Sequence, residues 1–270
     1  MSHVSSGELP DRFAVFGGVY NNYLSLEATL EDARRRGCEA IYCLGDMGGF
    51  GPHPDRSIEI LRNSDDVAVM QGNYDHSIGH RLDDCACGYT DPRDNHFAQI
   101  SYEYTLKKTS DTHKNWLRDL PRAFRFRRNR RRILMAHGSP RRVNEFLWES
   151  TSSDAFLGYL LDEHGSDILF VTHTGIPWRR RLPDDRLVVN VGAIGRPPND
   201  GHTCVPYVLV DMDSEKLDAR FIDVHYPHER LAEEMRDEGL PEEFAETIVS
   251  GWWTTCLEIL PAKERMKGKY

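Results

Sequence analysis

The stretch EAIYCLGDMGGFGP, residues 39–52, decides the fold. Its first six residues form a short apolar run of the length expected for a buried strand, and a glycine-rich loop beginning with Gly45-Asp46 follows at once. Two further apolar runs, at 12–16 and 66–70, are likewise followed by glycines. Helical patterns separate the three runs, at 23–36 and 54–62. This alternation predicts a parallel sheet, whose ligands bind just beyond the carboxyl ends of the strands.

The remainder of the chain continues the mixture of helices and strands. The segment 76–94 has turn residues and charges but no periodicity, which indicates a functional loop. Helices are expected at 95–108, 112–120, 154–163 and 228–238, and a further helix follows residues 239–241 and ends at about 250. Strands are expected at 123–126, 132–136, 168–172, 187–191, 206–211 and 219–223. We expect one domain over 1–270, with a core at about 12–223 and a helical tail at about 224–270.

Composition and charge exclude several classes of protein. The 270 residues include 34 Lys and Arg against 43 Asp and Glu, a net charge of −9 that disfavours a nucleic-acid ligand. No run approaches the roughly 18 apolar residues of a membrane helix. Residues 1–12 lack the apolar centre of a signal peptide. We therefore expect a cytoplasmic protein whose six cysteines are thiols or ligands before they are disulfides.

Four polar residues with ligand chemistry fall at the ends of predicted strands. Asp46, Asn73, His137 and His173 each lie beside small residues. One carboxylate, one amide and two imidazoles at one sheet edge would form a mixed nitrogen and oxygen site for a divalent metal. The alternative for any one of them is an ordinary loop residue, but four at strand ends favour the metal site.

The motifs around these residues resemble those of the calcineurin-like metallophosphoesterase superfamily. The matching motifs are Gly45-Asp46, GNYD at 72–75, HGSP at 137–140 and THT at 172–174. LGDMGGFGP at 44–52 and NVGAIGRP at 190–197 are similar to segments of its compact prokaryotic phosphoesterase branch. The resemblance covers about 12–223. It implies a four-layer α/β/β/α sandwich, here with a C-terminal helical appendage, and a metal-dependent phosphoesterase, either a phosphatase or a phosphodiesterase.

The departures from the family pattern concern one of its two metals. Gly18 and Tyr20 stand where the family has its first Asp and His, and Gly175 stands where it has its last His. The resemblance assigns these three positions to one metal only. The other metal keeps its whole set: Asp46, which the family shares between both metals, with Asn73, His137 and His173.

Three interpretations follow from this partial site. In the first, the protein holds a single metal. In the second, Tyr20, a nearby His or the cysteine loop replaces the missing ligands of the second metal. In the third, hydrolysis is lost. The last case gives an inactive protein that binds a phosphate ligand or a protein partner. The metal is manganese, iron or zinc, with one or two ions per chain, and the expected substrate is a phosphorylated small molecule or a nucleotide.

Further residues are candidates for roles around the metal. Tyr74, which replaces the family's catalytic His, and His53 are candidate proton donors, and Asp75 is expected to orient a neighbouring group. Arg179 and Arg196 are candidates for substrate binding, and Cys85 and Cys87 for thiols on a lid. The arginine-rich segment 122–132 is interpreted as a solvated hairpin paired with acidic residues, the alternative being contacts to phosphates. Trp252-Trp253 is either buried in the tail or a docking surface for a homo-oligomer.

Overall fold

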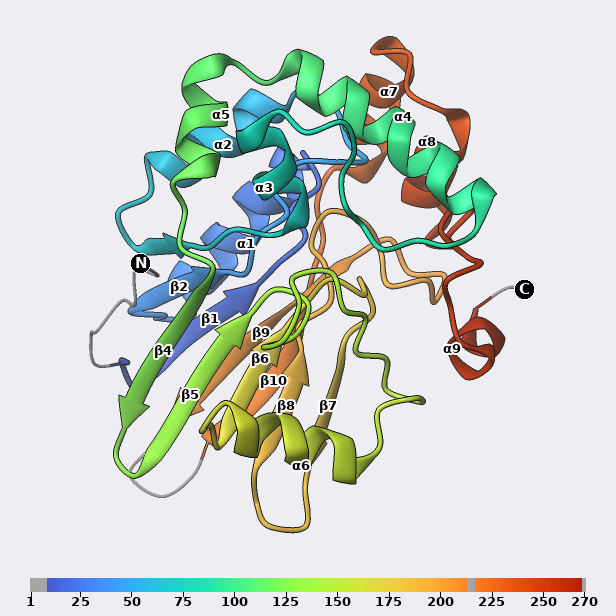
Figure 1. Cartoon of the computed structure of the whole chain (residues 1–270). Coiled ribbons are helices and arrows are strands. Elements are labelled where there is room, and N and C mark those ends of the chain that lie inside the picture. The colour runs from blue at the N-terminus through green and yellow to red at the C-terminus, as the bar shows by residue number, and fades with distance from the viewer. Residues whose placement is uncertain (1–8, 213–216, 269–270) are drawn as a thin grey trace.

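Two five-stranded sheets packed face to face form the centre of the protein in this computed structural model (Figure 1). The structure describes residues 9–212 and 217–268, so most of the segment from which we argued against a signal peptide lies outside it. Helices cover both outer faces of the pair of sheets, which confirms the predicted α/β sandwich. Within the described ranges, no helix is long and apolar enough to cross a membrane.

The first sheet contains the parallel unit predicted from the N-terminal sequence. Its strand order is β10-β9-β1-β2-β3. The strands β1 (Arg12–Phe16), β2 (Ala40–Cys43) and β3 (Val67–Val69) run parallel to one another. The sheet is mixed because β9 (Val205–Met212) pairs antiparallel with both β1 and β10 (Leu217–Val224).

The second sheet has the strand order β4-β5-β6-β8-β7. Its strands are β4 (Ala123–Arg128), β5 (Arg131–Ala136), β6 (Ile168–Val171), β7 (Trp178–Arg181) and β8 (Leu187–Asn190). The sequence analysis missed β7, because its sequence WRRR has almost no apolar alternation and the strand is held at the sheet edge by β8. The strands β4 and β5 also extend beyond the predicted strands 123–126 and 132–136, which shortens the turn between them.

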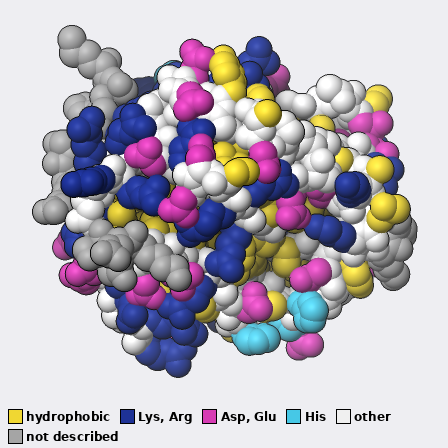
Figure 2. Space-filling view, turned by 90° about the horizontal axis from the view of Figure 1, so that it is seen from below, with side chains coloured by type: hydrophobic (Ala, Val, Ile, Leu, Met, Phe, Trp, Pro, Cys, Tyr) yellow, Lys and Arg dark blue, Asp and Glu magenta, His cyan; other side chains and the backbone are white. Residues whose placement is uncertain are grey.

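The basic hairpin pairs with acidic side chains, as interpreted from the net charge. Arg131 lies 2.5 Å from Asp185, and Arg132 lies 2.8 Å from Asp167. Figure 2 shows the face at this end of the molecule, where acidic side chains lie among Lys and Arg over part of the surface and Lys and Arg form a dense cluster at one edge. Exposed pairs of this kind add little to stability, and they neutralise only part of the positive charge of the hairpin.

The helices occur mostly where the sequence predicted them. They are α1 (Tyr23–Arg35), α2 (Pro54–Arg62), α3 (Asn73–His80), α4 (Pro92–Lys108), α5 (Asp111–Arg118), α6 (Asp154–Glu163), α7 (His228–Asp237), α8 (Glu242–Ser250) and α9 (Ala262–Lys267). The helix α3 corrects the prediction of a loop from residue 76 onward. This helix is short and polar, and its start is capped by Asp75, whose carboxylate accepts the amide of Gly72 at 2.7 Å.

Alternating side chains on the strands divide the core into three layers. Phe13 and Val15 of β1 pack against the second sheet, whereas Ala14 and Phe16 pack against the helices. On the outer face of the second sheet, apolar residues of α6 cover those of β5, β6 and β8. The strand period of two places successive residues on opposite faces, and each face buries its apolar side chains.

The C-terminal tail returns to the centre of the molecule. Trp253 is fully buried, its backbone amide donates to Asn199 Oδ1 at 2.8 Å, and its indole N–H donates to the Pro197 carbonyl at 2.6 Å. The suggestion that Trp252-Trp253 docks a second protomer therefore fails for Trp253. The tail instead packs against the segment that follows β8.

Candidate metal centre

Three potential ligands meet where the ends of both sheets come together. Asp46 follows β2, His137 follows β5 and His173 follows β6, and their ligand atoms all lie within 4.8 Å of one another. His137 Nε2 lies 3.1 Å from Asp46 Oδ2 and 3.3 Å from His173 Nδ1. All three side chains are buried. The face-to-face packing of the sheets thus brings together residues that are up to 127 positions apart, the difference between 173 and 46.

The backbone of this cluster is strained. Asp46 and His173 have φ values of 57° and 69°, which place two non-glycine residues in the left-handed region. A Cβ on Gly72 would lie 2.6 Å from the backbone nitrogen of Asp46 and 2.8 Å from His137 Cε1, so the loops approach as closely as they do only because residue 72 is glycine. Strain of this kind persists where the surroundings enforce it, and it concentrates at functional sites.

The hydrogen bonds around the cluster leave metal-binding atoms free. Nδ1 of His137 lies 2.7 Å from the Leu44 carbonyl, which places a proton on Nδ1 and leaves Nε2 facing Asp46, where a metal would displace any second proton. Asn73 donates its amide to the Cys85 carbonyl at 2.9 Å. Among the described residues, Asn73 Oδ1 and His173 Nε2 are buried and have no hydrogen-bond partner of normal geometry. Buried polar atoms rarely stay unpaired, so the Asn73 oxygen fits a cation, whereas the backbone of Cys87 and of Asn144 also lies within reach of the His173 ring.

The electrostatics also suit a cation. Burial acts to raise the pKa of Asp46, but the neighbouring His137 outweighs it and the pKa is lowered, so Asp46 is ionised. Burial together with the charge of His137 lowers the pKa of His173 to about 3, so this imidazole is neutral, as a metal ligand must be. One carboxylate, one amide oxygen and two imidazoles form a set that manganese, iron and zinc all accept.

The backbone around Asp46 is organised by its neighbours. Asp75 accepts the amides of Asp46, Met47 and Gly72 at 2.7, 2.9 and 2.7 Å. The Tyr74 amide donates to Asp46 Oδ1 at 3.0 Å. The structure thus places Asp75 behind the ligands, in a position to orient their loops. Its own pKa is raised to about 7 by burial and by the charge of Asp46.

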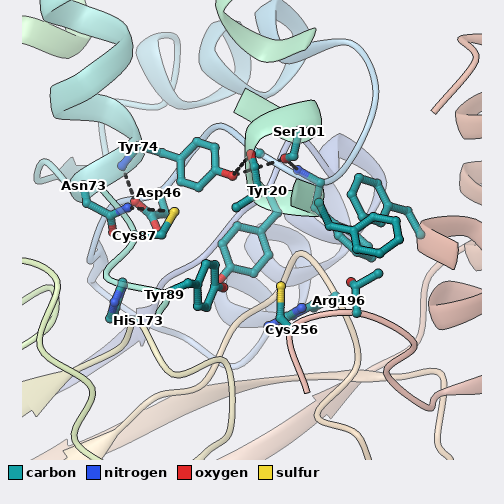
Figure 3. A pocket seen from close by; sticks show the side chains of 16 residues that line it. Tyr20, Asp46, Asn73, Tyr74, Cys87, Tyr89, Ser101, His173, Arg196 and Cys256 are labelled. Carbon is teal, nitrogen blue, oxygen red and sulfur yellow. Dashed lines mark hydrogen bonds between the residues drawn. The ribbon is translucent and has the colours of Figure 1, made fainter. Parts of the chain in front are cut away.

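A pocket of about 50 Å³ opens beside these residues (Figure 3). In this view Asp46, Asn73 and His173 line one side, Arg196 and Cys256 line the other, and Tyr20 and Tyr89 lie between them. The pocket has room for a few water molecules or a small oxyanion. It therefore joins the candidate ligands to a buried arginine.

Comparisons with known proteins identify the family of this chain. The sequence model of the calcineurin-like phosphoesterase superfamily domain matches residues 12–215. The chain belongs to the calcineurin-like phosphoesterase superfamily. It is 25% identical over 254 residues to an uncharacterized protein of Methanocaldococcus jannaschii, covering 88% of this chain and 97% of that protein.

Two crystal structures of relatives share the fold of this phosphoesterase-family chain. A hypothetical protein from Pyrococcus horikoshii matches with a TM-score of 0.74 and 25% identity, covering 90% of this chain and 99% of that one. A metallophosphoesterase from Sphaerobacter thermophilus matches with a TM-score of 0.68 and 25% identity, covering 91% and 100%. Both similarities extend over about nine-tenths of this chain.

Two of the expected site residues lie elsewhere in this phosphoesterase fold. His53 precedes α2 with a φ of 56°, and this turn directs its imidazole toward α7, where Nε2 lies 3.5 Å from Glu234. Arg179 donates to the Ala219 carbonyl of β10. The strand β7 is an edge strand of the second sheet, and β10 is an edge strand of the first. Neither residue lines the pocket, so the structure does not bring His53 or Arg179 together with the candidate ligands.

Tyr74 lines the pocket but directs its hydroxyl away from the ligands. The phenol oxygen lies 3.3 Å from both the Ala98 carbonyl and Ser101 Oγ on α4. Burial also raises its pKa. Tyr74 contributes to the site through its amide, and the phenol is badly placed to donate a proton to a leaving group.

Cys85 and Cys87 are joined by a disulfide, which corrects the expectation of lid thiols. Their Cα atoms are 5.3 Å apart, a separation that a disulfide accepts. Cys87 lines the pocket, and its sulfur lies 3.5 Å from Asn73 Nδ2. The disulfide-bridged loop thus covers Asn73, and its two cysteines are not free thiolates that could bind a metal.

Sequence reasoning missed Tyr89 and Cys256 as pocket residues. Tyr89 comes from the loop that was only broadly marked as functional, and Cys256 lies in the tail, well after the last family motif. No local pattern marks either residue, because each enters the pocket only when its segment packs across the site.

Proposed function

We propose that this protein hydrolyses phosphoesters with one divalent metal ion held by Asp46, Asn73, His137 and His173. The observation that carries this is the buried cluster of Asp46, His137 and His173, whose ligand atoms lie within 4.8 Å of one another, together with Asn73 Oδ1, a buried atom without a hydrogen-bond partner. Membership of the superfamily supplies the reaction class. The arrangement of these side chains supports a single ion in preference to the family's usual pair.

A bound divalent cation supplies Lewis acidity, which lowers the pKa of water and draws charge from a phosphoryl oxygen. The chain's own residues prepare the place for it. Asp75 holds the amides of Asp46 and Met47 and so fixes the loop that carries the anionic ligand. The Leu44 carbonyl fixes the tautomer of His137. Burial excludes bulk water, which strengthens each electrostatic contact in the pocket.

The substrate class follows from the size and the charge of the pocket. A volume of about 50 Å³ accepts a phosphoryl group and leaves the rest of the ester outside. A phosphorylated small molecule or a nucleotide fits this arrangement. Whether the bond cleaved belongs to a monoester or to a diester is decided by the assay below.

Elemental analysis of protein purified without added metal, together with an ester screen, tests this function. We expect about one metal ion per chain. We also expect release of phosphate or alcohol from some monoester, diester or nucleotide when manganese, iron or zinc is supplied, and chelation should stop it. A protein that holds the metal and gains thermal stability from phosphate, but turns over no ester under any of these metals, would be a binding module and would overturn the proposal.

A further inference from the structure

Arg196 is a buried cation without a counter-ion. Only 6% of the surface of Arg196 is exposed, and its Nε has no hydrogen-bond partner. No carboxylate in residues 9–212 or 217–268 forms an ion pair with it. A guanidinium removed from water is stable only when an anion or several acceptors compensate the lost hydration. The pocket that Arg196 lines is the place from which such an anion would come.

Aromatic rings hold this guanidinium in position. Its Cζ lies 3.6 Å from the centre of the Trp253 ring and 5.8 Å from the centres of both the Tyr20 and Phe50 rings. Stacking on an aromatic face orients the planar group and offsets part of its desolvation, but the rings accept no hydrogen bond in the plane of the guanidinium. Nε has no partner, and the side chain within hydrogen-bond reach of the group is the weak acceptor Cys256. The arrangement is a rigid, preorganised donor group.

The same residues occupy the space that ligands of a second metal would need. A Cβ on Gly175 would lie 3.2 Å from the Trp253 ring and 3.5 Å from Arg196 Nη2. A Cβ on Gly18 would lie 2.9 Å from Cζ of Tyr20. Both glycines also have positive φ, 74° and 56°, which side chains rarely adopt. The residues present therefore do not fit a second metal at these two positions.

We propose that Arg196 is the anion-binding residue of this pocket, and that it binds phosphate oxygens of the substrate where the second metal's ligands are missing. This inference rests on the proposed function, because the ligand cluster on the other side of the pocket defines the reacting group. Arginine presents several fixed N–H donors and is always charged, so it can bind an oxyanion with no metal at this position.

Binding of inorganic phosphate and of pyrophosphate to metal-loaded protein tests the role of Arg196. We compare wild type with Arg196→Met, which keeps the length of the side chain without the charge, and with Arg196→Lys. Arg179→Met is the matched control, since Arg179 lies outside the pocket and contacts the Ala219 carbonyl. Metal content and the melting temperature of each variant show whether the site and the fold survive.

We expect Arg196→Met to keep about one metal per chain while its affinity for phosphate, pyrophosphate or both falls about 10- to 100-fold, as one or two charge-assisted hydrogen bonds would give. Arg196→Lys should recover part of the loss, and Arg179→Met should bind like wild type. Unchanged affinity for both anions in Arg196→Met, or two metals per chain in wild type, would overturn the inference.

The two proposals fail in different ways. If Arg196→Met loses anion binding but neither wild type nor any variant hydrolyses an ester, the role of Arg196 in anion binding is supported and the proposed hydrolase activity is refuted. If Arg196→Met hydrolyses an ester with the KM and kcat of wild type, the role of Arg196 is refuted and the hydrolase stands. Should Arg196→Met fail to fold, the Arg196→Lys protein answers the same question, and anion affinities equal to those of wild type would count against the proposal.

Discussion

The two sides of the pocket differ in what they bury. On the ligand side, comprising Asp46, Asn73, His137 and His173, polar atoms are left unpaired and the loops are strained. On the aromatic side, comprising Tyr20, Trp253 and Arg196, the space is filled by rings and a guanidinium. Under the two proposals above, one half of the family's dimetal site is kept while a fixed organic cation occupies the other.

The largest expected effect is loss of the ligand side. His137→Ala or His173→Ala should lower metal affinity and hydrolysis at least about 100-fold, because each removes a direct ligand of the proposed ion. Metal per chain by elemental analysis and turnover of an aryl phosphate measure this effect. His113→Ala is the control, since His113 is equally buried but pairs with Asp55 at 2.7 Å. Full metal occupancy in both ligand variants would refute the assignment.

Removal of the support behind the ligand side should cost stability as well as activity. Asp75→Asn replaces one acceptor of three buried amides by a donor, which should lower the free energy of unfolding by about 2–4 kcal/mol. Urea unfolding of the metal-free protein measures this change. Asp184→Asn, at an exposed turn, should leave the free energy of unfolding unchanged. Equal stability of the two variants would show that Asp75 does not organise the loops.

Rebuilding the aromatic side should fail. Gly175→His should destabilise the protein by about 2–4 kcal/mol, because it forces a side chain onto a positive φ and against Trp253. The triple variant Gly18→Asp, Tyr20→His, Gly175→His should therefore still bind a single metal and be less active than wild type. A triple variant that binds two metals and becomes an efficient phosphodiesterase, from an inert wild type, would identify the native chain as a decayed enzyme.

The smallest expected effect tests Tyr20 as a substitute ligand. Burial raises the pKa of Tyr20, with Asp46 adding to it against the opposing charge of Arg196, so the phenol stays neutral. We expect iron-loaded protein to show no visible phenolate band, and Tyr20→Phe to change metal content less than about twofold. A band that Tyr20→Phe abolishes would assign Tyr20 to the metal and contradict the description of the aromatic side.

The comparison also shows which parts of the site the sequence could predict. Asp46, Asn73 and His173 were found because each closes a short motif at the end of a strand, and ends of parallel strands meet at one edge. His53 and Arg179 lie away from the pocket, because adjacency in sequence to a site says nothing about side-chain direction. Both lie on segments that turn away, one toward α7 and one toward β10.

By itself, the sequence determined the alternation of strands and helices, the superfamily and the set of candidate ligands, since these depend on local periodicity and on short ordered motifs. Only the tertiary structure decided what fills the other side of the pocket. Trp253 and Cys256 reach Arg196 from the C-terminal tail, and Cys87 reaches Asn73 from the loop before α4. Packing between segments distant in sequence places these groups, and no local pattern records which side chains such packing will bring together.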